Sequence, residues 1–435
     1  MKKVVLFLVL GLLACGGPNS REPSVLLVII DTMRADHLGC MGYHRNTTPT
    51  LDSLARAGTL FTACQSQSSW TLPAVATIFS GKTPREHMAG MHYDTFFGVA
   101  AELPWMPMIF RANGYSTAAF FNVIFLDADF GFHRGFDHFD CYSTLASETP
   151  PRTAGETVDA FLEWDEKKSE DEPFFAAVHL FDPHIPYDPP DPWNTLFTDP
   201  EYQGEYDNTW GDMDQLEAVN SGRDTIPPDG IANLVALYDG ELAYTDFELK
   251  RMLDSLDARG GLENTILVVV GDHGEEFLEH GGIEHGRTLY QEVCHVPLIF
   301  AGPGVPSGVR SDITVGQIHI MPTILDLAGI ETEESSLFSE DFREEPVPAS
   351  NVLWHGGNLA SLVQGDDKII WSVDDGITEQ YDLSNDPDEQ NSTTPDSALL
   401  AELEWYYGTP PLVRPPHVDL VATIQRELRN LGYIR

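Results

Sequence analysis

Basic residues and cysteines are both scarce in this chain, and each scarcity narrows the range of possible functions. The 435 residues hold 25 lysines and arginines against 68 aspartates and glutamates, which gives a formal net charge of −43. Such a negative surface repels nucleic acid and anionic lipid headgroups, so neither is expected to bind it. It also repels anionic substrates at long range. A site for them therefore needs a local cation, which a bound metal would supply.

The five cysteines include no C-x-x-C pair, which argues against a zinc knuckle. One of them, Cys15, belongs to an N-terminal targeting segment. In an exported protein the other four can form disulfides or stay as buried thiols, and the sequence leaves both alternatives open. They are Cys40, Cys64, Cys141 and Cys294.

The N-terminal segment is typical of a bacterial lipoprotein. Two lysines precede an apolar run over residues 4–14 that is too short to span a bilayer, and Cys15 follows directly. This lipobox pattern predicts a signal peptide over residues 1–14 and acylation of Cys15. We expect residues 15–24 to be a lipidated tether that anchors an exported protein in the cell envelope. Gly16, in place of an aspartate, favours the outer membrane. No later segment is a transmembrane candidate.

Continuous apolar, β-branched runs alternate with helical patterns along the rest of the chain. Such runs predict strands buried on both faces, which is typical of a parallel sheet covered by helices. Strands that alternate with helices indicate an α/β domain. The strand-like runs lie at 25–30, 116–121, 174–178, 265–270 and 296–300, and the helical patterns at 50–57 and 233–258.

Two other segments break this pattern. Residues 188–230 are rich in Pro, Asp, Asn, Gly and Trp and lack periodicity, and we interpret them as an irregular excursion that covers a pocket like a lid. A loose surface insertion is the alternative. From residue 346 onward the chain is typical of a smaller unit, with a strand-like segment at 368–373 and a closing amphipathic helix at 418–431. We therefore expect a catalytic domain over 25–345 and a C-terminal subdomain over 346–435.

Two of the buried strands run directly into acidic residues. Asp31 follows the first strand, and Asp272-His273 follows the strand at 265–270. Ligands of open α/β sheets bind beyond the carboxyl ends of the strands, and acids and histidines there are common metal ligands. Either acid alone could cap the following helix. Together they predict a metal site of Asp31, Asp272 and His273.

Further polar groups cluster after the same strands. The strand at 174–178 leads into His179, Asp182 and His184, and His285 follows the metal pair. One isolated histidine is usually structural, but several that converge at strand ends predict a site. Thr71 stands where a helix begins, and the free N–H groups of a helix start favour an anion. A plain capping threonine is the alternative, and a neighbouring metal would make Thr71 a nucleophile candidate.

These segments, in order, resemble the sulfatase branch of the alkaline phosphatase superfamily. They are LLVIIDTMRADHLGCMGYHRNTTPTLDSLARAGTLF, SSWTLPAVATIFSGKTP, FFAAVHLFDPHIPYDPP, TILVVVGDHGEEFLEHG, HGRTLYQEVCHVPLIF and EQYDLSNDPDEQN. The resemblance implies an α/β/α sandwich like that of alkaline phosphatase, with a small C-terminal α+β subdomain. It also implies an ester hydrolase with one divalent metal ion, whether Ca, Mg, Mn or Zn. The family's metal residues fall on Asp31, Asp272 and His273, its anion-contacting histidine on His184, and the region of a frequent lysine near His285.

The chain departs from the sulfatase pattern at the position that carries the chemistry. Typical sulfatases have C-x-P-x-R, whose cysteine becomes formylglycine, whereas this chain has Thr71-Leu72-Pro73-Ala74-Val75. Formylglycine is not expected, because oxidation of a threonine at Cβ gives a ketone. In addition, Thr32 follows Asp31 where many sulfatases have a second acid.

Threonine at this position resembles the phosphoryl-handling branches, namely nucleotide pyrophosphatases/phosphodiesterases and the phosphoglycerol or phosphoethanolamine transferases. There it is both nucleophile and metal ligand, and an asparagine can hold the non-bridging oxygens, a role for which Asn122 is the candidate here. The sequence thus predicts a metal bound by Asp31, Thr71, Asp272 and His273.

In this hypothesis Thr71 attacks the phosphorus or sulfur of a small anionic ester. His184, His285 and Asn122 stabilise the charge, and His285 or His179 protonates the leaving group. A second metal at Asp182 is left open. Three interpretations compete: a phosphoester hydrolase or transferase, a sulfuric ester hydrolase that works without formylglycine, and a non-catalytic binding lipoprotein that retains the fold.

Overall fold

The computed structural model describes residues 22–418 except for the short ranges 93–94, 143–151, 170–171 and 352–356. The lipoprotein segment with Cys15 and nearly all of the helix expected at 418–431 lie outside the described residues, so both stay predictions. Among the described helices, none is long and apolar enough to cross a membrane.

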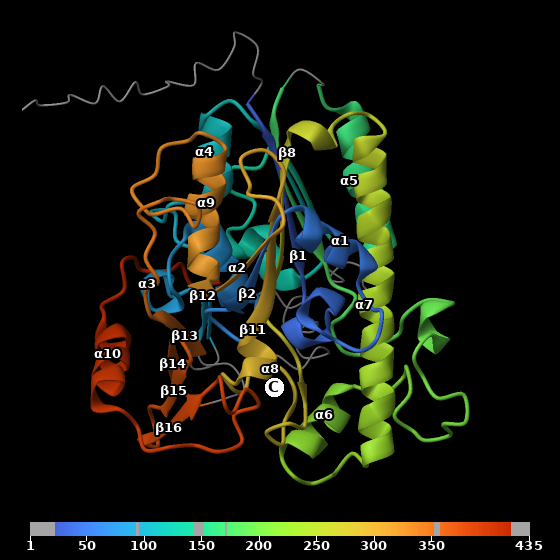
Figure 1. Ribbon diagram of the computed structural model, residues 1–435, viewed down its shortest axis with the longest axis vertical. Helices are drawn as coiled ribbons and strands as arrows, with labels where there is room; N and C mark the ends of the chain where they lie inside the picture. Colours follow the sequence, from blue (N-terminus) through green and yellow to red (C-terminus); the bar gives the residue numbers. More distant parts are fainter. Residues whose placement is uncertain (1–21, 93–94, 143–151, 170–171, 352–356, 419–435) are drawn as a thin grey trace, which may run out of the picture.

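An eight-stranded sheet forms the centre of the molecule (Figure 1). Its strands are β1 (Ser24–Ile30), β2 (Thr59–Gln65), β5 (Ser116–Phe121), β6 (His138–Cys141), β7 (Phe174–Leu180), β8 (Thr265–Gly271), β11 (His295–Ala301) and β12 (Val309–Gly316). They lie in the order β12-β2-β11-β8-β1-β7-β5-β6, and only β11 runs antiparallel to its neighbours. The predicted α/β class with a mostly parallel sheet is therefore confirmed.

Helices cover both faces of this sheet, and the side chains of β1 explain why. Val25, Leu27 and Ile29 pack on one face, with α2 (Thr71–Ser80), α4 (Met106–Ala112) and α9 (Ile320–Leu327). The alternate residues of β1 pack on the other face, with α1 (Pro49–Ala57), α5 (Ala154–Lys167) and α7 (Pro228–Asp257). Burying each such side chain contributes roughly 1.5–3 kcal/mol, so an apolar strand with no polar face is stable only between two helix layers.

The irregular excursion is attached to the rest of the molecule. Between residues 188 and 227 the structure has a 3₁₀ turn at Trp193–Thr195 and the helix α6 (Met213–Asn220), and the helix predicted from 233 begins earlier, at Pro228. The side chain of Asn220 exchanges hydrogen bonds with the backbone N–H (2.9 Å) and carbonyl (3.1 Å) of Ile283. Ile283 belongs to the hairpin of β9 (Glu276–Phe277) and β10 (Ile283–Glu284).

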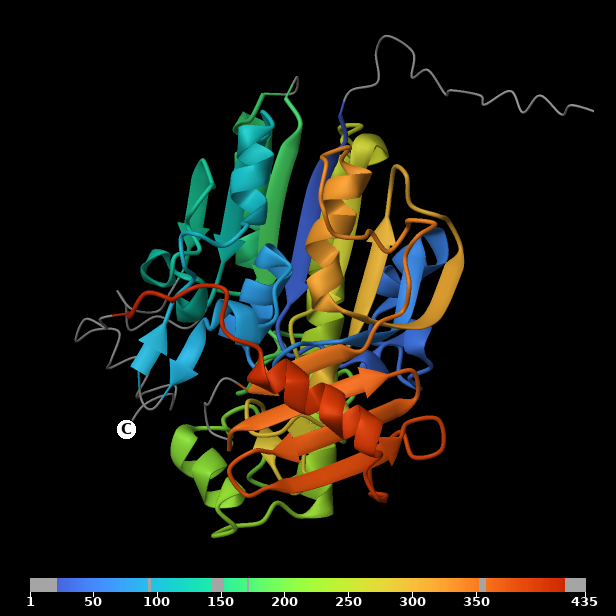
Figure 2. The ribbon, with the colours of Figure 1, turned by 90° about the vertical axis from the view of Figure 1, so that its left-hand side faces the viewer.

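A second, antiparallel sheet follows in the C-terminal part of the chain (Figure 2). It consists of β13 (Val347–Asn351), β14 (Leu359–Gln364), β15 (Asp367–Ser372) and β16 (Ile377–Asp382), and α10 (Ser397–Gly408) packs against it. The fully buried ion pair of Lys368 Nζ and Glu389 Oε1, at 2.8 Å, links β15 to the chain after β16. Besides several 3₁₀ turns, the described residues also form the short helices α3 (Pro84–His87) and α8 (Gln291–Cys294) and the hairpin of β3 (Gly90–His92) and β4 (Thr95–Phe97).

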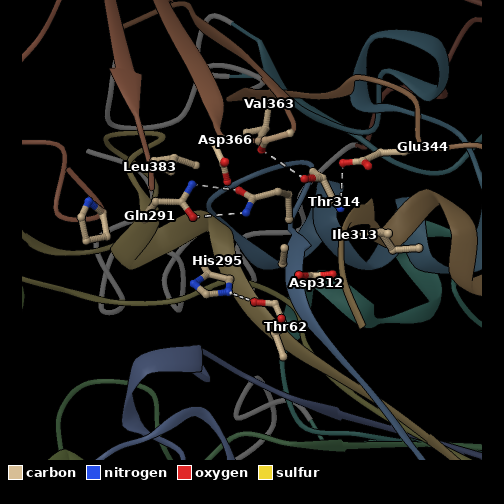
Figure 3. Close-up of a pocket in the computed structure, with 14 residues that line it drawn as sticks. Thr62, Gln291, His295, Asp312, Ile313, Thr314, Glu344, Val363, Asp366 and Leu383 are labelled. Carbon is tan, nitrogen blue, oxygen red and sulfur yellow. Dashed lines mark hydrogen bonds between the residues drawn. The ribbon is translucent and has the colours of Figure 1, made fainter. Parts of the chain in front are cut away.

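A pocket of about 410 Å³ lies at the seam between the two sheets (Figure 3). The amides of Gln65 and Gln291 exchange hydrogen bonds of 3.0 and 3.2 Å on its wall. Three acids, Asp312, Glu344 and Asp366, also line it, and none of the predicted site residues does. The pocket is thus separate from the predicted metal site. The four cysteines of the described chain are free thiols rather than disulfides.

Candidate active site

Two carboxylates and one imidazole meet where the three central strands end. The register aligns Ile30 of β1 with Gly271 of β8, and Ile29 of β1 with His179 of β7. Because these strands are parallel, Asp31, Asp272 and His179 emerge at one edge of the sheet. Their ligand atoms lie within 4.8 Å of one another, and all three residues are buried.

His273 brings a fourth ligand atom to this group. Its Nδ1–H donates to the carbonyl of Gly274 at 3.0 Å, and a carbonyl only accepts, so Nε2 carries the free lone pair. That Nε2 lies 3.6 Å from Asp31 Oδ1 and 3.5 Å from Asp272 Oδ2. Asp31, His179, Asp272 and His273 together are called the metal group below, as candidate ligands of a metal ion.

The backbone after β1 is shaped to support this group. Thr32 adopts a left-handed conformation, with φ of 50°, which is uncommon for a β-branched residue. Its N–H donates to Asp272 Oδ1 at 3.2 Å, and its carbonyl accepts from the Tyr238 hydroxyl at 2.7 Å. A backbone N–H from this position, rather than a second acidic side chain, thus contacts the metal group.

The polar atoms of this group fit a cation. Both Asp31 oxygens, Asp272 Oδ2 and both ring nitrogens of His179 are buried, and none has a hydrogen-bond partner outside this group among the described residues. Within the group, His179 Nε2 lies 3.3 Å from Asp31 Oδ2. Burial, reinforced by the charge of Asp31, raises the pKa of Asp272 to about 6. At Asp31 the effect of burial is outweighed by His179, His184 and His273, which hold its pKa below the usual value. Buried charges of this kind normally coordinate a metal, because leaving them unpaired costs several kcal/mol.

Thr71 lies beside this group. It is the first residue of α2, and the capping position is Trp70, so the hydroxyl of Thr71 is not used as a helix cap. The side chain is buried, and Oγ1 lies 3.3 Å from His273 Nε2. The helix α2 begins at this place, and the free N–H groups of its first turn favour an anion there.

Two histidines stand next to the metal group and differ in their partners. The ring centre of His285 lies 4.4 Å from that of His273 and 4.9 Å from that of His184. His184 Nδ1 donates to the carbonyl of Ile185 at 2.6 Å, and burial lowers the pKa of His184. His285 Nδ1 instead lies 3.0 Å from Glu275 Oε1, with both side chains fully buried. Each ring therefore has its Nδ1 held and turns Nε2 away from that partner.

Asn122 and Asp182 are engaged elsewhere. The Asn122 amide donates to Thr157 Oγ1 at 2.7 Å and to the carbonyl of His179 at 2.8 Å. Its oxygen accepts from Arg152 Nε at 3.0 Å. Both N–H groups of Asn122 are thus occupied in supporting the strand that carries His179. Asp182 accepts from the backbone N–H of Ala154 at 3.0 Å, at the start of α5, and is not part of the metal group.

The sequence named His179 as an alternative to His285 for proton transfer and did not single out Glu275. The structure places His179 among the candidate metal ligands, and the available signal was a histidine inside an otherwise apolar buried strand. Glu275 carried no distinguishing signal, because its partner His285 lies ten residues further along the chain.

The chain is similar to proteins of known family and known structure. Residues 23–330 match the family model named Sulfatase. An arylsulfatase of Clostridium perfringens is 26% identical, over 85% of this chain and 89% of its own length. A protein solved with its substrate D-glucosamine-2-N,6-O-disulfate has a TM-score of 0.71 at 20% identity, covering 89% of this chain and 97% of that one. The phosphonate monoester hydrolase of Agrobacterium radiobacter has a TM-score of 0.69 at 20% identity, covering 88% and 94% respectively. These structural likenesses show a shared fold.

Proposed function

This chain belongs to the sulfatase family and is a hydrolase of ester bonds, and from this premise we propose that it hydrolyses small phosphate-type esters with Thr71 as nucleophile. One observation carries the proposal. In the segment that resembles the sulfatase C-x-P-x-R motif, the residue in the place of the cysteine is the buried Thr71, whose Oγ1 lies 3.3 Å from His273 Nε2. A threonine hydroxyl forms a phosphate ester with phosphorus, whereas formylglycine chemistry needs an aldehyde that threonine does not give.

The metal would be held by Asp31, His179, Asp272 and His273, with Thr71 completing the set. A bound divalent cation would neutralise the carboxylates, polarise an oxygen of the ester and favour the alkoxide of Thr71. Imidazole nitrogens mixed with carboxylate oxygens suit Zn²⁺ or Mn²⁺ better than Ca²⁺, which prefers oxygen ligands only. We therefore propose Zn²⁺ or Mn²⁺ as the native ion.

Different residues of the chain carry out nucleophilic attack, proton transfer and stabilisation of charge. Thr71 Oγ1 attacks phosphorus in line, so the threonine O–P bond forms as the bond to the leaving oxygen breaks. His285 Nε2 gives that oxygen a proton, and Glu275 keeps the ring oriented through Nδ1. His184 and the N–H groups at the start of α2 stabilise the equatorial oxygens. Water, or an alcohol in a transferase, then attacks the phosphothreonine and gives its proton to His285 Nε2. The bond from phosphorus to Thr71 Oγ1 breaks, which restores the threonine alkoxide and releases phosphate or a phosphate ester.

Sulfate ester hydrolysis is the second candidate, and family membership favours it. The relatives named above include both an arylsulfatase and a phosphonate monoester hydrolase. Sulfate chemistry here would have to proceed without formylglycine. The threonine at position 71 favours hydrolysis of a phosphate-type ester. Turnover of sulfate esters or of phosphate esters distinguishes the two candidate functions.

The experiment compares aryl sulfates with aryl phosphate mono- and diesters and phosphonate esters, each with Zn²⁺, Mn²⁺, Mg²⁺ or Ca²⁺. We expect metal-dependent phosphate ester turnover that falls roughly 10³-fold or more in Thr71→Ala and is partly kept in Thr71→Ser. Thr77→Ala is the matched control on α2, because the Thr77 hydroxyl bonds His87 Nε2 instead. Sulfate turnover that survives in Thr71→Ala would rule out the proposed mechanism.

We also propose that the mature protein is tethered to the bacterial cell envelope through acylated Cys15, as its lipobox predicts. Labelling of the expressed chain with a fatty acid tests this. Incorporation that persists in Cys15→Ser would contradict it.

A further inference from the structure

We propose that Asn351, at the end of β13 in the C-terminal sheet, is a positioning residue for the active site. It would hold the segment before Thr71 against the segment after His285. The inference rests on the proposed function, in which Thr71 and His285 act on the same ester. Asn351 lies beyond residues 23–330, the part of the chain that matches the family model.

The contacts of Asn351 reach two separate segments. Its Oδ1 accepts from the Ser69 hydroxyl at 2.6 Å and faces the Ser69 N–H at 3.4 Å. Its Nδ2 donates to the carbonyl of Gly286 at 3.1 Å and faces that of Thr288 at 3.4 Å. Asn351 is 1% exposed, so these contacts are not exchanged for water. The amide therefore uses its donors and its acceptor together as a cross-link.

Both segments lead directly to reacting side chains. Ser69 stands two residues before Thr71, and Gly286 directly follows His285. Gly286 has a φ of 82°, a left-handed conformation that gives the segment a sharp turn at this point. Because each segment is short, a shift at Ser69 or Gly286 moves the nucleophile or the proposed proton donor.

The segment before Thr71 has a second anchor on its other side. The Ser66 hydroxyl lies 2.6 Å from the carbonyl of Asp272, which ties the start of the segment to a metal residue. Asn351 ties its end to the His285 segment. The two anchors together fix Thr71 relative to both the metal group and His285. A misplacement of about 1 Å at a reacting group can reduce the rate about 10²-fold.

The kinetic test is a double-mutant cycle. Asn351→Ala and Ser69→Ala should each lower kcat for phosphate esters about 10²-fold with little change in KM. The double variant should lose no more than the worse single variant, because both remove the same link. Ser350→Ala is the control on the same strand. Its backbone N–H, which bonds the carbonyl of Gln67 at 2.9 Å, is kept, and kcat should stay within about twofold. Independent, multiplicative losses in the double variant would overturn the proposal, as would full activity of Asn351→Ala.

Hydrogen exchange gives a readout that does not depend on turnover. In Asn351→Ala, peptides that cover residues 66–70 and 286–288 should exchange faster than in the wild type, while β14 stays protected. Asn351→Asp keeps the acceptor for Ser69 and loses the donors, so only 286–288 should lose protection. It also serves if the alanine variant fails to fold. Unchanged exchange at both segments would contradict the cross-link. If turnover does not depend on Thr71, the proposed function is refuted. The hydrogen exchange result then decides the role of Asn351 by itself.

Discussion

Replacing Asp31 by asparagine tests the metal group without changing the shape of the site. Asp31 is fully buried, its Oδ2 lies 3.3 Å from His179 Nε2, and neither of its oxygens has a hydrogen-bond partner outside the metal group among the described residues. Its charge also contributes to the raised pKa of Asp272. His179, His184 and His273 outweigh the effect of burial and hold the pKa of Asp31 below its usual value, so the carboxylate is charged with or without a cation, and with a cation it becomes a ligand. Asp31→Asn removes that charged ligand, so it should gain less stability from metal than the wild type does.

The magnitude follows from linkage. A cation at about 1,000 times its Kd stabilises the native state by about 4.1 kcal/mol. A melting entropy of about 2.1 cal/mol/K per residue over roughly 400 residues converts this to a rise in Tm of about 5 °C. If the asparagine weakens binding about 10²-fold, the same metal concentration gives about 1.4 kcal/mol, or about 2 °C.

The assay is a thermal melt in EDTA and in a titration with Zn²⁺ or Mn²⁺. Asp246→Asn is the control, because this buried acid accepts from the backbone N–H groups of Thr50 and Leu51 at 2.9 Å, away from the metal group. Its Tm should fall by the same amount with and without metal. An equal metal response in Asp31→Asn and the wild type would refute the reasoning.

Three further predictions concern other parts of the chain. Lys368→Met leaves Glu389 buried and unpaired, so denaturant unfolding should show a loss of about 3–5 kcal/mol, which the double variant with Glu389→Leu should largely recover. Burial lowers the pKa of His87 to about 3, so its neutral form favours folding and stability falls as the pH drops below about 6.5. Between pH 7 and 5, His87→Gln should therefore lose about 2 kcal/mol less stability than the wild type in urea unfolding. Glu275→Leu removes the carboxyl group that holds His285 Nδ1, so kcat/KM should fall more for alkyl esters than for nitrophenyl esters, whose leaving group needs no proton. Equal loss on both ester types would remove Glu275 from this role.

Five of the eight strands of the central sheet, and the acids that follow two of them, could be predicted because their signals are local, whereas β2, β6 and β12 were not predicted. The run from Val25 to Ile30 is apolar on both faces, and Asp31 follows it directly. The same holds for the strand that ends before Asp272. Once these strands are parallel, both acids emerge at one edge of the sheet, and the pairing of β1 with β8 in the structure makes them neighbours.

The contacts that could not be predicted from the sequence depend on pairings between distant segments. His179 joins the metal group because β7 aligns it with Ile29 of β1, a register set only when the sheet assembles. The amide of Asn122 is occupied because Arg152 and Thr157, some thirty residues later, fold back onto it. The link from Asn351 to Ser69 spans 282 positions in the sequence. No local pattern marks any of these contacts.

The central claim is that Thr71 carries the phosphoryl group between two in-line displacements. The stereochemical course at phosphorus tests it most directly, with a chiral phosphorothioate diester hydrolysed in ¹⁸O-labelled water by the metal-loaded enzyme. Each in-line displacement inverts the configuration, so attack by Thr71 followed by attack of water predicts net retention. Net inversion would mean that water attacks the ester in a single step, and it would contradict a covalent role for Thr71.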